Sequence, residues 1–343
     1  MDNNALRAVM VGCGGISGTW LDALKTMSDV EIVGLVDLDL EAARTRADQY
    51  ALTEAVIDHD LPAILENTDP DIVFNCTVPG AHHEVTLTAL RSGAHVLGEK
   101  PLANSIEEAR EMVEAAEAAD RIFAVIQNRR YQPAVRRLRR FLASGRIGRI
   151  TTVDSDFYIG AHFGGFRDRM EHVLLVDMAI HTFDAARYIS GADATSVYCH
   201  EWNPVGSWYD HDASAIAVFE MTDDLVYSYR GSWCSEGCNT SWESSWRIVG
   251  TQGSVLWDGN DGFDIQVVEE TDGFFSELAD VTMPPLSDED RIGRHTGVIR
   301  EFVDCVHSGC IPETIGSDNI KSLAMVFGAV ESSESGGKVL IEV

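Results

Sequence analysis

Lysine is scarce in this chain. Only four of its 26 basic residues are lysines, at positions Lys25, Lys100, Lys321 and Lys338. Positive charge as a whole is scarce too, because 55 acidic residues bring the formal net charge to -29 at pH 7. A chain of this charge repels nucleic acids and anionic membrane surfaces, so we expect neither as a partner. Acidity combined with so little lysine favours a salt-adapted, halophilic surface, with an ordinary acidic mesophilic protein as the alternative.

Long apolar runs and metal-type cysteine spacings are also missing. No apolar stretch approaches the ~20 residues of a membrane-spanning helix. Residues 1–15 have no basic start, and their apolar run leads into glycines, so we expect no signal peptide and a cytoplasmic location. The close pairs among the seven cysteines, Cys234 with Cys238 and Cys305 with Cys310, do not match zinc-site spacings. We therefore expect no metal site, and free thiols in a reducing cytoplasm.

Short apolar runs alternate with helical segments over the first 128 residues. These runs occupy residues 7–12, 30–37, 71–78, 94–101 and 121–128. Near-continuous apolar strands that alternate with helices are typical of a parallel sheet covered on both faces. We predict an α/β chain whose residues 1–128 form a Rossmann domain with a doubly wound parallel sheet.

Beyond residue 128 the pattern changes to an alternation of polar and apolar residues, as in residues 151–160 and 214–233. This alternation is typical of antiparallel strands joined by turns. We predict that residues 129–343 form an α+β domain with a large, mostly antiparallel open sheet. Its few helices suffice to cover one face of the sheet, so we expect the other face to meet a second subunit in a homodimer or homotetramer.

The segment from Gly12 to Gly18, "GCGGISG", follows the first apolar run and opens the first helix. Gly12 permits a tight turn, and Gly14 lets a pyrophosphate approach the backbone at the helix N-terminus. The third position of the motif holds Ser17, which is small enough for close packing of the helix on the strand. The strand–turn–helix context makes this a specific signal for a dinucleotide.

Asp37 ends the second apolar run, 25 residues after Gly12. A carboxylate at this point accepts hydrogen bonds from the hydroxyls of the adenine ribose. It would repel a 2′-phosphate, and the neighbouring Leu38 supplies no positive charge. We therefore expect NAD as the cofactor, with NADP less favoured.

Four stretches of the chain together resemble the glucose-fructose oxidoreductase / inositol dehydrogenase (Gfo/Idh/MocA) family of NAD(P)-dependent sugar and cyclitol dehydrogenases. They are "VGCGGISG", "CTVPGAHHE", "SGAHVLGEKPLANSIEEA" and "LLVDMAIHTFDAARYISG", and the resemblance runs nearly from end to end. Where the family often has a glycine run before the last of these helices, this chain has Glu171 and His172. We expect their side chains to reshape the substrate pocket.

The resemblance implies a cofactor site and a substrate site. The residues expected to bind the cofactor are Gly12, Gly14, Gly15, Ile16, Ser17, Asp37, Leu38, Thr77, His82, Glu99, Lys100 and Gln127. Those expected to bind the substrate, a sugar or cyclitol, are Lys100, Tyr158, Arg167, His172, Asp177, His181 and His295.

The resemblance also implies an NAD-dependent dehydrogenase with Lys100, Asp177 and His181 as the catalytic set. A hydride leaves a secondary alcohol for the nicotinamide, and a base takes the hydroxyl proton. Asp177 and His181 are four residues apart on one predicted helix. His181 is the first choice for the base, with Lys100 binding the same oxygen, and Lys100 itself is the alternative base because a buried lysine can lose its proton. Two other functions stay open: a non-catalytic regulatory protein that binds NAD and a sugar, and an oxidoreductase with a tightly bound cofactor.

Overall fold

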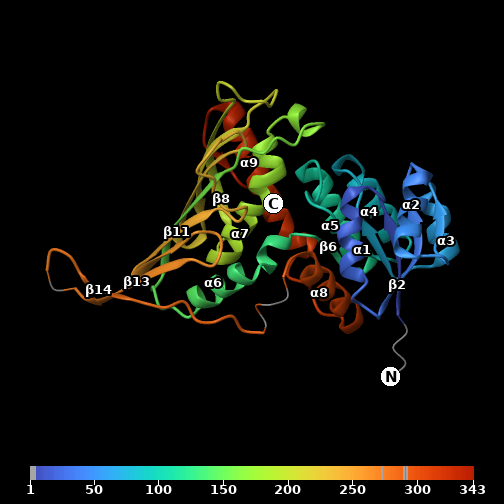
Figure 1. Ribbon diagram of the computed structural model, residues 1–343, viewed down its shortest axis with the longest axis horizontal. Helices are drawn as coiled ribbons and strands as arrows, with labels where there is room; N and C mark the ends of the chain where they lie inside the picture. The colour runs from blue at the N-terminus through green and yellow to red at the C-terminus, as the bar shows by residue number, and fades with distance from the viewer. Residues whose placement is uncertain (1–4, 272, 289, 291–292) are drawn as a thin grey trace. The chain divides into compact units, whose positions relative to one another are not determined.

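The computed structural model describes residues 5–271, 273–288, 290 and 293–343 (Figure 1). Its internal contacts divide the chain into two compact units. Unit 1 comprises residues 1–128 and 293–323, and unit 2 comprises residues 129–292 and 324–343. The sequence led us to expect one boundary at residue 128, with everything after it in the second domain. The segment 293–323 instead lies in unit 1, because its helix packs against the first helix of that unit.

Unit 1 contains a six-stranded parallel sheet with the strand order β3-β2-β1-β4-β5-β6. This is the order of a Rossmann fold, with the reversal between β1 and β4. The predicted parallel sheet is therefore confirmed. Its strands are β1 (Leu6–Val11), β2 (Val30–Val36), β3 (Val56–Asp58), β4 (Ile72–Asn75), β5 (His95–Gly98) and β6 (Phe123–Val125).

Three helices of unit 1 begin where the sequence supplies caps. The side chains of Asp39, Asp60 and Ser105 accept hydrogen bonds from backbone amides in the first turns of α2, α3 and α5. The helical segments are α1 (Gly15–Leu24), α2 (Leu40–Tyr50), α3 (Leu61–Thr68), the short η1 (Pro79–Ala81), α4 (His82–Arg91), α5 (Ile106–Ala119) and α8 (Arg294–Ser308). A last helix, α9 (Gly316–Ser335), starts in unit 1 and ends in unit 2.

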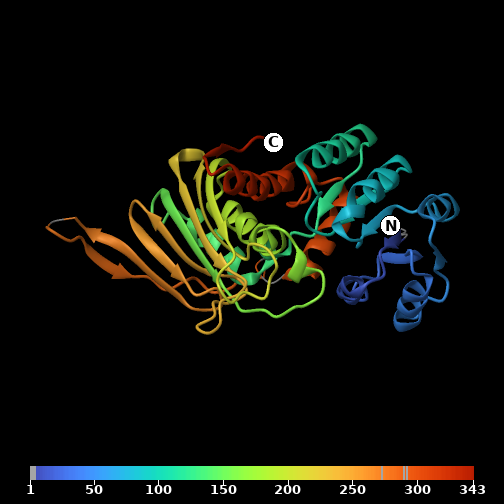
Figure 2. The ribbon, with the colours of Figure 1, turned by 90° about the horizontal axis from the view of Figure 1, so that it is seen from above.

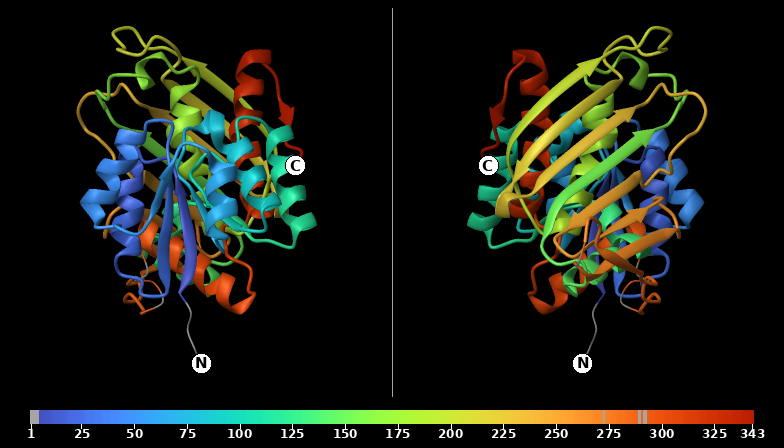
Figure 3. Two further views of the ribbon diagram at one scale, coloured as in Figure 1. Left: turned by 90° about the vertical axis from the view of Figure 1, so that its right-hand side faces the viewer. Right: turned by 90° about the vertical axis from the view of Figure 1, so that its left-hand side faces the viewer.

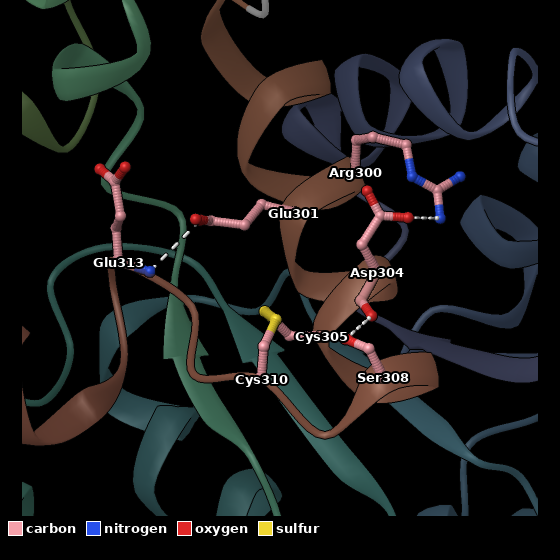
Figure 4. The surroundings of a disulfide bond; sticks show 7 residues. All are labelled: Arg300, Glu301, Asp304, Cys305, Ser308, Cys310 and Glu313. Carbon is pink, nitrogen blue, oxygen red and sulfur yellow. Dashed lines mark hydrogen bonds and ion pairs between the residues drawn. A yellow bond between two sulfur atoms is a disulfide. The ribbon is translucent and has the colours of Figure 1, made fainter. Parts of the chain in front are cut away.

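A disulfide joins Cys305 in the last turn of α8 to Cys310 in the loop that follows (Figure 4). The expectation that these two cysteines are free thiols is therefore wrong. Gly309 turns the chain with a φ of 73°, which brings the two Cα atoms to 4.5 Å from each other. Further along this loop, Thr314 accepts a hydrogen bond from Val125 and so extends the edge of the parallel sheet at β6.

Unit 2 contains a nine-stranded sheet with the order β14-β13-β12-β11-β7-β10-β9-β8-β15. All neighbouring strands are antiparallel except β7 and β10, which confirms a mostly antiparallel sheet. The strands are β7 (Ile150–Tyr158), β8 (Ala194–Trp202), β9 (Ser214–Met221), β10 (Val226–Ser232), β11 (Ser245–Gly250), β12 (Gly253–Trp257), β13 (Phe263–Glu270), β14 (Glu277–Asp280) and β15 (Val339–Leu340).

Helices cover one face of this sheet. Phe183 on α7 packs its ring against Phe219 and Tyr229 of the sheet, at centroid distances of 4.9 and 5.2 Å. Ser332 on α9 accepts a hydrogen bond from the Cys199 amide of β8, and Figure 2 shows both helices on the same side of the strands. The helical segments of unit 2 are η2 (Asn128–Tyr131) at its start, α6 (Pro133–Ala143), η3 (Arg167–Arg169), the π-helical η4 (Leu174–Ala179), α7 (Ile180–Ser190) and η5 (Thr222–Asp224).

The other face of the sheet carries exposed side chains. Ile216 and Val218 on β9 are 43% and 40% exposed, while their neighbours along the strand are buried. In the right-hand view of Figure 3 the strands lie in front and the helices behind them. Among the described residues, no helix is long and apolar enough to cross a membrane.

A buried ion pair ties α7 to the start of unit 2. Arg130 and Asp184 have side chains that are 6% and 0% exposed, and Arg130 Nε donates to Asp184 Oδ2 at 2.9 Å. Removing one partner of a buried pair leaves an uncompensated charge. We predict that Asp184→Asn lowers the free energy of unfolding by about 3–5 kcal/mol, measured by urea denaturation.

The matched control for this prediction is the exposed pair Arg230 with Asp156, in which the side chains are 56% and 30% exposed and 2.7 Å apart. Because solvent screens such a pair, Asp156→Asn should cost less than about 1 kcal/mol. Equal losses in the two variants would contradict the role that we assign to burial.

Candidate active site

The loop between β1 and α1 has the geometry of a pyrophosphate cradle. Gly12 has a φ of +90°, and a Cβ there would lie 2.5 Å from the Cys76 carbonyl oxygen, so no other residue fits. Cβ atoms at Gly14 and Gly15 would have no neighbour within 4 Å, which leaves open space beside the N-terminus of α1. Ser17 is fully buried and donates to the Gly14 carbonyl oxygen at 2.7 Å, as expected for a small residue in the third position. These residues fit a dinucleotide.

Asp37 lies directly beside this loop. Its carboxylate accepts hydrogen bonds from the backbone amides of Cys13 at 2.7 Å and Asp39 at 2.8 Å. A carboxylate has about four acceptor positions, so capacity remains for ribose hydroxyls. Leu38 next to it is 93% exposed. Asp37 therefore shapes the loop, and its predicted contact with the adenine ribose stays a prediction.

Glu99 is a buried carboxylate at the carboxyl end of β5. It accepts a hydrogen bond at 2.8 Å from the indole N–H of Trp20 on α1 and one at 3.2 Å from the backbone amide of Lys100. Burial raises the pKa of Glu99, while the Trp20 hydrogen bond and the charge of Lys100 act to lower it. Lys100 is half-buried, and the bond from Lys100 to Pro101 is cis.

His82 at the start of α4 joins two loops of the sheet edge. Its ring nitrogens lie 2.8 Å from the carbonyl oxygen of Pro101 and 3.1 Å from that of Thr77. Burial lowers the pKa of His82, which favours the neutral ring. His82 thus holds the Thr77 and Pro101 segments together, and its predicted contact with the cofactor stays a prediction.

His295 and Gln127 both belong to unit 1. Gln127 is fully buried directly after β6, and the following residue, Asn128, donates from its side-chain amide to His295 Nδ1 at 3.2 Å. His295 occupies the first turn of α8. Its place in unit 1 was not foreseen, because the sequence pattern assigned it to the second domain.

Asp177 and His181 lie on consecutive helical segments of unit 2. Asp177 is in the π-helix η4 and His181 in the first turn of α7, whereas the sequence pattern predicted one continuous α-helix. The amide of Ile180 donates to the Leu175 carbonyl oxygen, five residues back. Arg167 pairs with the Asp177 carboxylate through Nε at 2.8 Å and Nη2 at 3.3 Å. The structure thus brings two predicted site residues, Arg167 and Asp177, into direct contact.

His172 precedes the π-helix in a left-handed conformation, with a φ of 51°. Its Nδ1 lies 2.7 Å from Oε2 of Glu201, whose side chain is fully buried on β8. The hydrogen bond to Glu201 raises the pKa of His172, and burial raises that of Glu201. His172 and Glu201 thus form a coupled pair.

Tyr158 lies apart from this set. Along β7 the side chains of Val153, Ser155 and Phe157 are buried on the helix-covered face. Tyr158 has the opposite parity along the strand, together with Asp156, and both residues are partly exposed. Its predicted contact with the substrate stays a prediction. Among the residues that the structure describes, no group of three or more His, Cys, Asp or Glu side chains is arranged to hold a metal ion.

Sequence reasoning missed two residues that organise unit 1, Trp20 and Asn75. Asn75 is fully buried at the end of β4, where its side-chain oxygen accepts from the Thr77 hydroxyl at 2.6 Å and its backbone oxygen accepts from the Glu99 amide at 2.8 Å. A polar residue inside the apolar run 71–78 was the available signal for Asn75. Trp20 gave no such signal, since its partner Glu99 is 79 residues away.

Two family models match most of the chain. The NAD-binding Rossmann fold of the GFO/IDH/MocA oxidoreductase family matches residues 6–127, and the C-terminal domain of the same family matches residues 135–256. The chain belongs to this family.

Individual relatives agree with the family match. D-apiose dehydrogenase from Paraburkholderia graminis is 27% identical over 97% of this chain and 89% of its own length. D-glucoside 3-dehydrogenase from Escherichia coli is 31% identical over 68% of this chain and 66% of its own length. The crystal structure of an oxidoreductase from Agrobacterium radiobacter in complex with NAD+, L-tartaric acid and magnesium superimposes with a TM-score of 0.85, at 24% identity over 98% of both chains.

Family membership establishes the broad activity. The GFO/IDH/MocA match and the dehydrogenases among the relatives make this chain an NAD(P)-dependent oxidoreductase that acts on CH–OH groups. The Rossmann loop of unit 1 supplies the dinucleotide site that such an enzyme requires.

The Trp20–Glu99 hydrogen bond allows a pH-dependent prediction. Replacing Trp20 by Phe removes a donor that favours the charged carboxylate. We predict a loss of about 1–3 kcal/mol in unfolding free energy at pH 8. The loss should be smaller near pH 5, because protonated Glu99 needs this donor less. The pKa of Glu99 is raised above its usual 4.5, so the penalty of the variant should change with pH in the range above 4.5. Urea unfolding at both pH values measures it.

Trp257→Phe is the matched control for this variant. Trp257 is 1% exposed, and its indole N–H donates at 2.7 Å to the neutral backbone carbonyl of Asn260. Trp257→Phe should therefore lose the same amount of unfolding free energy at both pH values. A Trp20→Phe penalty that does not change with pH would contradict the role of Glu99.

Proposed function

We propose that the protein oxidises a secondary alcohol of a sugar, glycoside or cyclitol with NAD as the hydride acceptor. The observation that carries this proposal is the Glu99–Lys100–Pro101 segment at the carboxyl edge of the parallel sheet, where ligands bind in such folds. Glu99 is fixed by Trp20, so the backbone of Lys100 is held in place at the end of β5. The nicotinamide of NAD supplies the group that accepts the hydride.

In this proposal Lys100, Asp177 and His181 handle the proton of the substrate hydroxyl. His181 takes the proton as general base, and Lys100 donates a hydrogen bond to the same oxygen. Asp177 supports the charge that develops on the imidazole. Arg167 holds the Asp177 carboxylate through two hydrogen bonds, so its predicted contact with substrate becomes a positioning role. Lys100 is the alternative base.

The sugar class rests on the relatives. D-apiose dehydrogenase and D-glucoside 3-dehydrogenase are named for a free sugar and a glycoside, and both belong to the range of substrates that we propose. His172, just before the π-helix that carries Asp177, pairs with Glu201 on β8, so a paired side chain stands where the family often has glycine.

Replacing Lys100 tests the proposed chemistry. Lys100→Ala should lower kcat by roughly 10²–10⁴-fold, the usual contribution of a group in proton transfer. Lys100→Arg should fail as well, because arginine is larger and cannot release its proton. NADH formation at 340 nm with a panel of sugars and cyclitols gives the rates, and NAD affinity should change far less than kcat. The exposed Lys25 provides the control variant Lys25→Ala. Turnover of Lys100→Ala near that of the wild type would show a structural lysine.

Asp37 supports NAD over NADP as the cofactor. A 2′-phosphate would face its carboxylate, so kcat/KM should favour NAD by about tenfold or more. Asp37→Ser should narrow this ratio, and it should also lower the melting temperature slightly, because the Cys13 amide loses its acceptor. Equal or better kcat/KM with NADP in the wild-type protein would reject the assignment.

We propose in addition that the exposed face of the nine-stranded sheet mediates a dimer or tetramer with two-fold symmetry. Ile216 and Val218 on this face support it. Every subunit carries a net charge of -29, so repulsion should weaken assembly at low salt. Light scattering should give an oligomer at 2 M KCl, and the melting temperature should rise from 0.05 M to 2 M KCl because the charges are screened. A monomer at 2 M KCl, or an unchanged melting curve, would contradict this proposal.

A further inference from the structure

Three large aromatic side chains of unit 2 are exposed near the predicted substrate residues. Phe163, Phe166 and Trp242 are 45%, 63% and 48% exposed. We call these three residues the aromatic shelf. Aromatic rings of this size are normally buried, and a cluster of exposed ones marks a surface that binds something.

Buried rings anchor two members of the shelf. Trp233, which is 2% exposed, contacts Phe163 edge-on at a centroid distance of 5.1 Å and Trp242 at 5.7 Å. The fully buried Phe157 lies 5.2 Å from Trp233 and 6.4 Å from Trp242. Phe163 and Trp242 are therefore held in position before any ligand arrives. A ligand that covers them causes little further loss of side-chain conformational entropy.

The shelf adjoins the polar residues of the proposed reaction. The Arg167 guanidinium lies 5.0 Å from the ring centre of Phe163 and 4.8 Å from that of Phe166, while it pairs with Asp177. On the other side, Trp242 and His181 line one small cavity. Hydrogen-bonding groups and aromatic faces thus follow one another on the surface of the same unit, a combination that suits small ligands with polar and apolar parts.

We propose that the aromatic shelf is a subsite for the aglycone, or the second sugar ring, of a glycoside. The inference rests on the proposed function. The oxidised ring, rich in hydroxyls, is the part that Asp177 and His181 recognise. The half-exposed rings of the shelf meet the part of the ligand that points towards solvent. A pyranose ring presents a face of C–H groups, and an aryl group presents the face of its aromatic ring. Either face can stack on Phe166 and Trp242.

The size of the shelf favours such a ligand over a second protein chain. A fully buried aromatic side chain covers roughly 150–250 Å². Three that are about half exposed offer on the order of 300 Å², well below the ~800 Å² that each partner contributes to a stable protein interface. The charged pair of Arg167 and Asp177 at its border is suited to hydroxyl groups.

The test compares two ligands that share the sugar and differ in the aglycone. Methyl and phenyl β-D-glucopyranosides, and the matching galactosides, are titrated by calorimetry into the full-length protein saturated with NADH, so that no turnover occurs. The wild type should bind the phenyl glycoside about five- to tenfold more tightly than the methyl glycoside in at least one series. Trp242→Ala and Phe166→Ala should each bring this ratio close to one, with less than about a twofold change for the methyl glycoside. Trp242→Tyr should restore most of the ratio.

Phe274→Ala is the matched control, because Phe274 is 94% exposed in the same unit and lies outside the shelf. It should leave both affinities unchanged. Four results would overturn the proposal. The wild type could bind the phenyl and methyl glycosides equally well, or bind none of these glycosides. The preference for the phenyl glycoside could survive in both shelf variants, or these variants could lose affinity for both glycosides to the same extent. If the ratio behaves as expected while no alcohol in the panel reduces NAD, the proposed function fails and the aglycone subsite stands.

Discussion

The buried carboxylate of Glu99 is the constraint on which the rest of unit 1 depends. A carboxylate with so little exposure is costly unless donors surround it, and here the donors come from the indole of Trp20 and the amide of Lys100. The Glu99 amide in turn donates to Asn75 at the end of β4. Three elements, α1, β4 and β5, are therefore joined by hydrogen bonds at Glu99, and the backbone amide of Lys100 takes part in the same set.

Unit 2 uses a different device for its own polar residues. A π-helix carries Asp177 immediately before the α-helix that carries His181, and such wide turns often occur at functional sites. Arg167 holds the Asp177 carboxylate and at the same time lies on the rings of Phe163 and Phe166. One guanidinium thus links the proposed proton-transfer set to the exposed aromatic residues.

The sequence was sufficient where the signal is local. The glycines and Ser17 of the first loop, the position of Asp37 and the parallel sheet follow from patterns within a few residues, and family resemblance added Lys100, Asp177 and His181. Contacts between distant segments were out of reach, such as Trp20 with Glu99 or helix α8 with unit 1. The sequence showed the alternation along β7, but it did not show which face of the strand the helices cover. That choice of face decides where the Tyr158 side chain lies. The disulfide of Cys305 depends on the turn at Gly309, which spacing alone did not reveal.

We propose that the protein carries out a catalytic oxidation with exchangeable NAD. The most direct test counts the NADH molecules formed per protein chain when NAD and a panel of sugars, glycosides and cyclitols are supplied in excess, at low and at molar salt. The proposed chemistry predicts many turnovers per chain with at least one of these alcohols. A single NADH per chain would indicate an oxidoreductase with a tightly bound cofactor, and none, with NAD and sugar still bound, would indicate a regulatory protein; either result would contradict the claim.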